Sequence, residues 1–168
     1  MLGRTAVLAT MAACVFACGS PSPGATAQAA PAVLTPGQIE TALVVAMNRV
    51  RTANGRVPLR VVATLARPAR GHSRYLVASG RLDHDSSDGS PFWTRLVAAG
   101  FPKDHTMAEN LARVSGCSAE ASRRTVQMWM NSPAHRTNLL NPRMRWVGAG
   151  AASSRGCGTT ILTADFGS

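Results

Sequence analysis

The chain has 168 residues, of which 45% are hydrophobic, and it carries a formal net charge of +10. That length suits one domain and makes a second domain improbable on size alone. The basic residues are scattered, and no basic run with interleaved aromatic residues occurs, so we expect no nucleic-acid partner.

Residues 1–30 have the pattern of an export signal. Arg4 supplies a positive start, and the uncharged stretch 5–18 is well short of the roughly 20 residues that a membrane-spanning helix needs. Two routes fit this pattern: lipid attachment at a lipobox-like sequence ending in Cys18, with Cys14 as a weaker candidate, or cleavage after a small-x-small site and release. We therefore expect an extracytoplasmic protein, either secreted or anchored as a lipoprotein on the outer face of the membrane.

The segment 19–31 contains only small or uncharged residues and can bury almost nothing, which predicts a flexible tether. The remainder, 32–168, has the commonest size for a single domain. Without Arg4 the mature part has 17 basic and 8 acidic residues, a formal charge of +9. Such a charge favours attraction to an anionic envelope surface of lipid head groups or acidic wall polymers.

The first predicted helix begins with a capping box, in which Thr35 is the cap, Pro36 the first helical residue and Gln38 the reciprocal partner. It ends near Gly55. A second helix is predicted from near Thr64 to Gly80, with Pro68 near its first turn, where the missing N–H costs little. His72 lies on the apolar face of that helix and is expected to be a packed core residue.

A short third helix is predicted from the cap Ser90–Pro91 to Gly100, and a fourth starts at Ser118 and carries Trp129. A brief turn capped by Ser132 follows. The period then changes, and stretches 146–150 and 159–166 predict an antiparallel hairpin. Helices first and strands late indicate an α+β fold, with helices packed on a small antiparallel sheet.

Cys117 and Cys157 are the only cysteines outside the signal and tether. An oxidising compartment makes a disulfide between them the expected state. The alternative is a reactive thiol, which the absence of a CxxC motif and of a nearby histidine disfavours.

Several short motifs in the 32–168 region stand in the order seen in the CAP superfamily. This is the family of cysteine-rich secretory, antigen 5 and pathogenesis-related proteins, and the chain most resembles its bacterial SCP-like extracellular branch. The resemblance implies an α-β-α sandwich. It rests on Asn48-x-x-Arg51, Gly55-x-x-Pro58-Leu59, His84 before Asp88-Gly89, Glu109-Asn110, Trp129-Met130-x-Ser132-Pro133-x-His135-Arg136, Val147-Gly148-Ala149-Gly150 and Asp165-Phe166-Gly167.

The resemblance further implies that His84, Glu109 and His135 converge in one surface cleft and are the candidate catalytic residues. In some members the two histidines hold a divalent cation, and two imidazoles with a carboxylate match an open zinc site. Larger relatives have a second glutamate where this chain offers Arg95, whose charge would oppose a cation. The other residues expected to line the cleft are Asn110, Ser132 and Trp129.

Structural explanations compete for several of these residues. Glu109 and Asn110 can bind backbone donors and fix a wall of the cleft without doing chemistry. Ser132 precedes a proline, so a helix N-cap explains it better than a nucleophile paired with His135. His105 lies in a polar loop and is expected to face solvent. The three tryptophans are expected in the core or in the cleft wall.

Three functions from different classes follow. The first is a binding module, expected to be a monomer, whose cleft takes a lipid, a sterol-like molecule or a cell-wall ligand. The second is a non-catalytic envelope interaction protein. The third is a metal-assisted hydrolase or protease that uses His84, Glu109 and His135 with zinc as the cofactor.

Overall fold

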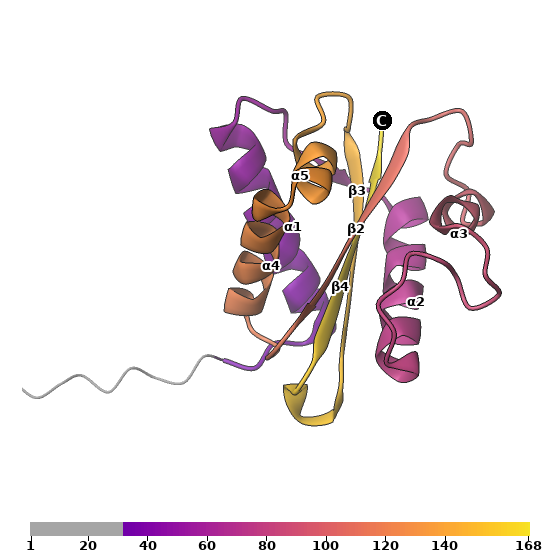
Figure 1. The fold of residues 1–168 in the computed structure, drawn as a ribbon. Coiled ribbons are helices and arrows are strands. Elements are labelled where there is room, and N and C mark those ends of the chain that lie inside the picture. The colour runs from indigo at the N-terminus through magenta and orange to yellow at the C-terminus, as the bar shows by residue number, and fades with distance from the viewer. Residues whose placement is uncertain (1–31) are drawn as a thin grey trace, which may run out of the picture. The chain divides into compact units, whose positions relative to one another are not determined.

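The computed structural model describes residues 32–168 (Figure 1). The predicted export signal, the tether and the lipidation candidates Cys14 and Cys18 lie outside the described residues. Within 32–168, no helix combines the length and the apolar character that crossing a membrane requires.

The core of the fold is one four-stranded sheet with the strand order β1-β3-β4-β2. The strands are β1 (Arg60–Val61), β2 (Met107–Val114), β3 (Trp146–Ser153) and β4 (Thr160–Gly167). β3 and β4 form the predicted antiparallel hairpin, and β2 pairs antiparallel with β4. The short β1 runs parallel to β3, so the sheet is mixed at one edge and not purely antiparallel as expected.

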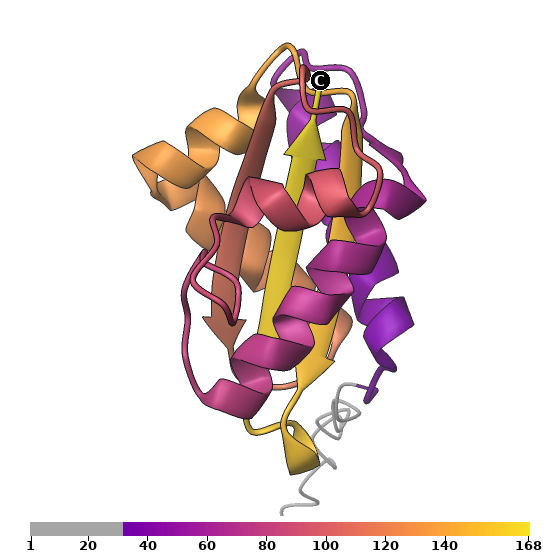
Figure 2. The ribbon, with the colours of Figure 1, turned by 90° about the vertical axis from the view of Figure 1, so that its right-hand side faces the viewer.

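Helices cover both faces of this sheet. One face packs against α1 (Pro36–Ala53), α4 (Ala119–Asn131) and α5 (Pro133–Leu140), and the other against α2 (Ala63–Ser79) and α3 (Phe92–Ala98). Figures 1 and 2 show these layers from the side and from the α2 face. The α+β sandwich is therefore confirmed.

The helix ends follow the sequence in part. Thr35 and Gln38 form the predicted capping box, with the Thr35 amide donating to Gln38 Oε1 over 2.9 Å. α2 begins at Ala63, next to the expected start at Thr64, and Pro68 lies in its second turn, so the helix loses one internal hydrogen bond there. At α3 the residue in the cap position is Pro91, and the Ser90 hydroxyl donates to Asp88 instead of capping the helix.

The strands β1 and β2 were not predicted, and the turn expected after α4 is a helix of eight residues, α5. β2 is an edge strand, and its outer side is met by α4 and α5. Trp129 on α4 donates its indole N–H to the carbonyl of Leu111 on β2 over 3.0 Å, which satisfies one group of the open edge.

The glycines of β3 allow α2 to lie directly on the sheet. A Cβ atom added to Gly148 would lie 2.0 Å from the carbonyl carbon of Leu65, and one on Gly150 would lie 2.2 Å from that of Ala69. Both contacts are with helix backbone, which cannot move aside without separating the helix from the sheet. The Gly-x-Gly pattern of β3 therefore reflects helix-on-sheet packing.

Asn48 and Arg51, two further residues of the family motifs, have structural roles on α1. The Asn48 side chain donates to the carbonyl of Leu59 and accepts a hydrogen bond from the Leu59 amide. Arg51 is fully buried and donates to the carbonyls of Val57, Leu139, Asn141 and Met144. Burial, followed by the charges of Arg145 and Arg56, lowers the pKa of Arg51.

The predicted disulfide between Cys117 and Cys157 is present. It joins the segment between β2 and α4 to the short 3-10 helix η1 (Arg155–Cys157) that connects β3 to β4. In the chain-entropy model, closing a loop of 40 residues stabilises the folded state by about 4 kcal/mol.

Candidate functional site

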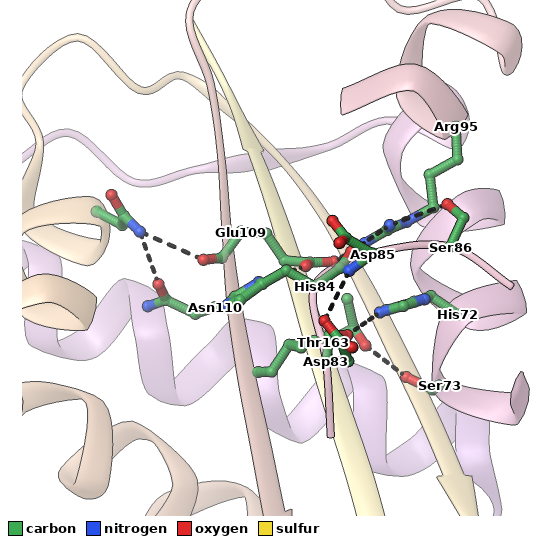
Figure 3. A network of polar contacts seen from close by, with 12 residues as sticks. His72, Ser73, Asp83, His84, Asp85, Ser86, Arg95, Glu109, Asn110 and Thr163 are labelled. Atoms are coloured by element: carbon green, nitrogen blue, oxygen red, sulfur yellow. Dashed lines mark hydrogen bonds and ion pairs between the residues drawn. The ribbon is translucent and has the colours of Figure 1, made fainter. Parts of the chain in front are cut away.

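Glu109 is the centre of the polar cluster on the α2 face of the sheet. Its side chain is fully buried, and its Oε1 atom lies 2.7 Å from Nδ1 of His84. Its other oxygen accepts a hydrogen bond from the guanidinium of Arg95 on α3. The imidazole of His84 is 52% exposed, so the buried carboxylate is linked to solvent through that ring. Figure 3 shows the three groups together.

The loop between α2 and α3 brings His84 to this position. His72 on α2 is buried, as predicted, and its Nε2 lies 2.8 Å from the carbonyl of Asp83. Arg95 donates to the carbonyl of His84 over 2.8 Å and lies 3.4 Å from the hydroxyl of Ser86. His72 and Arg95 therefore fix the loop from two sides (Figure 3).

The charges at this centre reinforce one another. The hydrogen bond to Glu109 raises the pKa of His84, against the opposing effect of burial. Burial alone would raise the pKa of Glu109, but the His84 hydrogen bond and the Arg95 charge outweigh it and hold that pKa below its usual value. At neutral pH, Glu109 is thus an anion between a guanidinium and an imidazole that favours its protonated form.

Asp165 is a second carboxyl group beside this centre, and it was expected only as part of the motif Asp165-Phe166-Gly167, not as a site residue. It lies opposite Glu109 in the register of β4 with β2 and is fully buried. Neither of its carboxyl oxygens has a hydrogen-bond partner in the part of the chain that the structure describes. Burial and the nearby charge of Glu109 raise the pKa of Asp165 well above its usual value. The signal was visible as an acid within an otherwise uncharged strand pattern.

His135 approaches the edge of β2 from the opposite face, on α5. Its Nδ1 lies 2.8 Å from the hydroxyl of Ser132, and its carbonyl accepts a hydrogen bond from the Asn110 side chain over 3.0 Å. Asn138 donates to the carbonyl of Glu109 and to the Asn110 side chain, which ties α5 to the strand. Burial and the charge of His84 lower the pKa of His135. His84 thus contacts Glu109, whereas the hydrogen-bond partners of His135 are Ser132 and Asn110.

The residues expected to line the cleft have different roles in the structure. Arg95 on α3 contacts Glu109 and His84, whereas the side chain of Asn110 on β2 contacts His135 and Asn138 of α5. Trp129 is only 1% exposed and belongs to the core, so it does not line a cleft; its position on the buried side of α4 is the reason. Ser132 occupies the N-cap position of α5, but its hydroxyl contacts His135 instead of a backbone amide.

His105 does not face solvent as predicted. Its ring stacks on Trp146 at a centroid distance of 5.4 Å and meets the edge of Phe101 at 5.7 Å. The local sequence is polar, but the loop folds this ring back onto the end of the sheet. Of the other tryptophans, Trp93 is 48% exposed and thus lies neither in the core nor in a closed wall.

The donor set for a metal ion is limited to two histidines. Within residues 32–168, no group of three His, Cys, Asp or Glu side chains is arranged to hold an ion. Glu109 uses both oxygens for His84 and Arg95, so it is not free to be a third ligand. Each imidazole uses Nδ1 in a hydrogen bond, which leaves the two Nε2 atoms as the donors that zinc could take.

Comparison with known proteins places this arrangement in a family. The family model described as the cysteine-rich secretory protein family, CAP, matches residues 44–166. The protein YkwD of Bacillus subtilis (strain 168) is 34% identical over 108 residues, which are 64% of this chain and 40% of that protein. The chain thus spans less than half the length of this relative.

Solved structures have the same fold. An extracellular protein containing an SCP domain from Bacillus anthracis str. Ames matches with a TM-score of 0.66 and 24% identity, over 78% of this chain and 40% of that one. An outer surface protein of Borrelia burgdorferi matches with a TM-score of 0.68 and 19% identity, over 82% of this chain and 98% of that one. Because the family model covers most of the chain from α1 to the end of β4, this protein belongs to the cysteine-rich secretory protein (CAP) family, in its bacterial SCP-like form.

Proposed function

We propose that this CAP protein is exported to the bacterial envelope or the extracellular space, where it binds an amphipathic ligand beside His84, Glu109 and Arg95. Two of its structural relatives are described as an extracellular and an outer surface protein, which supports the location. The main observation in support of a binding role is that Arg95 makes contacts in two directions. This side chain holds Glu109 on one side and lines an open pocket on the other.

The pocket lies between α2, α3 and the loop that carries His84, and its volume is about 410 Å³. That is within the range of small-molecule sites. Its lining is mainly apolar or uncharged, with Arg95 as its one residue of fixed charge: Pro68, Gly71, His72, Tyr75, Ser86, Ser87, Arg95, Ala98 and Ala99. A ligand with an apolar body and one anionic or carbonyl group fits this chemistry, which a lipid, a sterol-like molecule or a wall component can provide.

The test is a thermal-shift assay with lysophosphatidylglycerol and, separately, a soluble peptidoglycan fragment. Binding to the native state raises Tm by an amount that grows with the ratio of ligand concentration to Kd. We expect a rise with one of the two probes in the wild type. Ala98→Trp fills the pocket and should abolish the rise, whereas Ala78→Trp, at an exposed position on α2, should retain it.

No rise with either probe, or an equal rise in both tryptophan variants, would refute ligand binding in this pocket. If the variants behave alike and the protein still associates with envelope material through its surface arginines, the non-catalytic interaction protein is the better account.

A metal-assisted hydrolase is the second candidate, favoured by the two Nε2 atoms of His84 and His135. A bound zinc ion would supply an activated water there. Within the site, Glu109 would orient the His84 ring by holding its Nδ1 proton. Calorimetric titration of zinc into the wild type and into a His84→Ala, His135→Ala double variant tests this candidate, and identical heats would eliminate it.

A further inference from the structure

A second pocket lies at the end of the sheet where β1 and β3 begin and β4 ends. Figures 1 and 2 show that the C-terminal end of α1 and the connection from α5 to β3 lie at this same end. The pocket has a volume of about 330 Å³ and is lined by Val57, Pro58, Arg60, Arg145 and Trp146. None of these residues belongs to the His84 site or to the pocket beside it.

The backbone places the aromatic and basic residues of this pocket side by side. Arg60 and Trp146 are register partners in the parallel pair β1 and β3, and the Arg60 amide donates to the carbonyl of Arg145 over 2.9 Å. Two aromatic contacts fix the orientation of the Trp146 ring: His105 stacks on it, and Phe101 packs against it edge to face at a centroid distance of 6.2 Å. The partly exposed Trp146 ring thus lines the pocket together with Arg60 and with Arg145, whose guanidinium also donates to the carbonyls of Pro142 and Met144.

Positive charge is concentrated around this pocket. The connecting segments 54–59, 102–106 and 141–145, together with β1, contain Arg56, Arg60, Lys103, Arg143 and Arg145 and one acidic side chain, Asp104. All five basic residues are exposed, and none takes part in the ion pairs found between residues 32 and 168. The segments 54–59 and 141–145 meet at Arg51, which accepts a hydrogen bond from the Arg56 amide over 2.8 Å and donates to the carbonyl of Met144 over 3.0 Å.

We propose that this surface, the Trp146 pocket, binds an acidic glycan. The apolar face of a pyranose ring packs on an aromatic ring by dispersion and burial of C–H groups. Guanidinium groups bind carboxylate or phosphate substituents through charge-assisted, often bidentate hydrogen bonds. A chain of acidic sugars presents both features in alternation, and it matches the excess of unpaired positive charge around the pocket.

A nucleic acid fits this surface less well. Single strands are bound by several aromatic platforms along a basic groove, whereas the pocket offers one ring whose other face is covered by His105. A bare polyanion would use the arginines but would gain nothing from Trp146. These differences make the three classes of ligand separable in one experiment.

The experiment measures binding of the protein to hyaluronate by calorimetry at low salt and at about 0.15 M salt. Dextran is the neutral control, and polyphosphate and a single-stranded oligonucleotide are the polyanion controls. We expect hyaluronate to bind more tightly than either polyanion at the higher salt, and dextran not to bind. Equal affinity for all three polyanions would overturn the proposal in favour of attraction by charge alone, and tighter binding of the oligonucleotide would overturn it in favour of a nucleic acid.

Two matched pairs of variants locate the site. Arg56→Gln with Arg60→Gln should weaken hyaluronate binding by about tenfold or more, the equivalent of one good charge-assisted contact. Arg74→Gln with Arg155→Gln makes the same charge change at exposed positions elsewhere and should have less than about a twofold effect. An equal loss in both pairs would refute a defined pocket.

The third pair avoids any disturbance of the core. Val57 lines the pocket and is 57% exposed, so Val57→Glu adds a repelling charge without removing buried contacts, and Val57→Gln is its uncharged control. Only the glutamate variant should lose hyaluronate binding.

The contribution of the aromatic ring is tested separately. Trp146→Leu should weaken hyaluronate binding but leave polyphosphate binding unchanged. Equal effects on the binding of both probes would eliminate the contribution of ring stacking.

Discussion

The two faces of the sheet pack against their helices through different kinds of side chains. The face under α1, α4 and α5 packs one continuous apolar core that includes Leu43, Trp129 and Phe166. The face under α2 and α3 has only two small apolar clusters, around Leu65 and around Leu76. Between them lie the polar groups, including two buried carboxyls. The two faces thus have different roles. Apolar burial on the first face stabilises the fold, and this stabilisation offsets the free-energy cost of burying charged groups on the second face.

Arg51 is the main polar exception on the apolar face, and its replacement gives the largest expected effect. Arg51→Leu removes the donor from four carbonyls, two of them in buried hydrogen bonds, so we expect it to lower the free energy of unfolding by about 4 kcal/mol. Urea denaturation followed by tryptophan fluorescence measures this change. Arg49→Leu, at an exposed position on the same helix, should change stability by less than about 0.5 kcal/mol. A stable Arg51→Leu protein would show that water or rearranged backbone satisfies these carbonyls.

On the other face, the contact between α2 and β3 is the feature most sensitive to volume. Gly148→Ala forces the helix away from the sheet, and we expect a loss of about 3 kcal/mol. The matched control is Gly71→Ala on α2, where an added Cβ has no neighbour within 4 Å. That variant should gain about 0.5–1 kcal/mol from helix propensity. Thermal and urea denaturation of the two variants measure both signs, and an equal response would contradict the close packing.

These contrasts explain why some elements were predictable and others were not. The capping box of α1 and the hairpin of β3 and β4 are local patterns, and both are present as predicted. β2 escaped because its two consecutive polar residues, Glu109 and Asn110, are both buried, one toward each face. A strand that is polar on both sides at its middle has no alternating pattern. Its strand character depends on partners that are remote in the sequence.

The same reasoning applies to the site. The family resemblance indicated His84, Glu109 and His135, but it could not show that Arg95 occupies one oxygen of Glu109 or that His135 contacts Ser132. Trp129 was expected either in the core or in the cleft wall. The helical phase of α4 turns it into the core. Contacts between side chains from different elements are decided by packing, which local sequence patterns do not encode.

Replacement of Asp165 tests how much the buried carboxyl groups of the polar face lower the free energy of unfolding. Because its pKa is raised in the folded state, its favourable contribution is complete below the pKa of the unfolded chain and is lost as the pH rises through the folded value. We expect Asp165→Asn to remove this decline and to raise the free energy of unfolding by about 1 kcal/mol at neutral pH. Urea denaturation between acidic and neutral pH measures it. Asp85→Asn, at an exposed position, should leave the pH profile unchanged.

The smallest expected effect concerns the charge of His84, and NMR titration of the imidazoles reports it directly. Glu109→Gln removes the carboxylate that raises the pKa of His84, so that pKa should fall. Asp83→Asn removes a weaker attraction and should lower it by less. In the reverse direction, His84→Gln should raise the pKa of His135, because the charge of His84 is one of the two causes that lower it.

The two titrations together test whether the imidazoles belong to one site. His84 contributes stability that is complete below its unfolded pKa and is lost as the pH rises through its higher folded pKa, but the ring is half exposed and the contribution is small. The pKa of His135 therefore reports the interaction between the two rings more sensitively than the pH dependence of stability does. If it does not respond to His84→Gln, the rings on the two sides of β2 act independently. The Glu109 cluster would then include His84 but not His135, and a two-histidine metal site would have no basis.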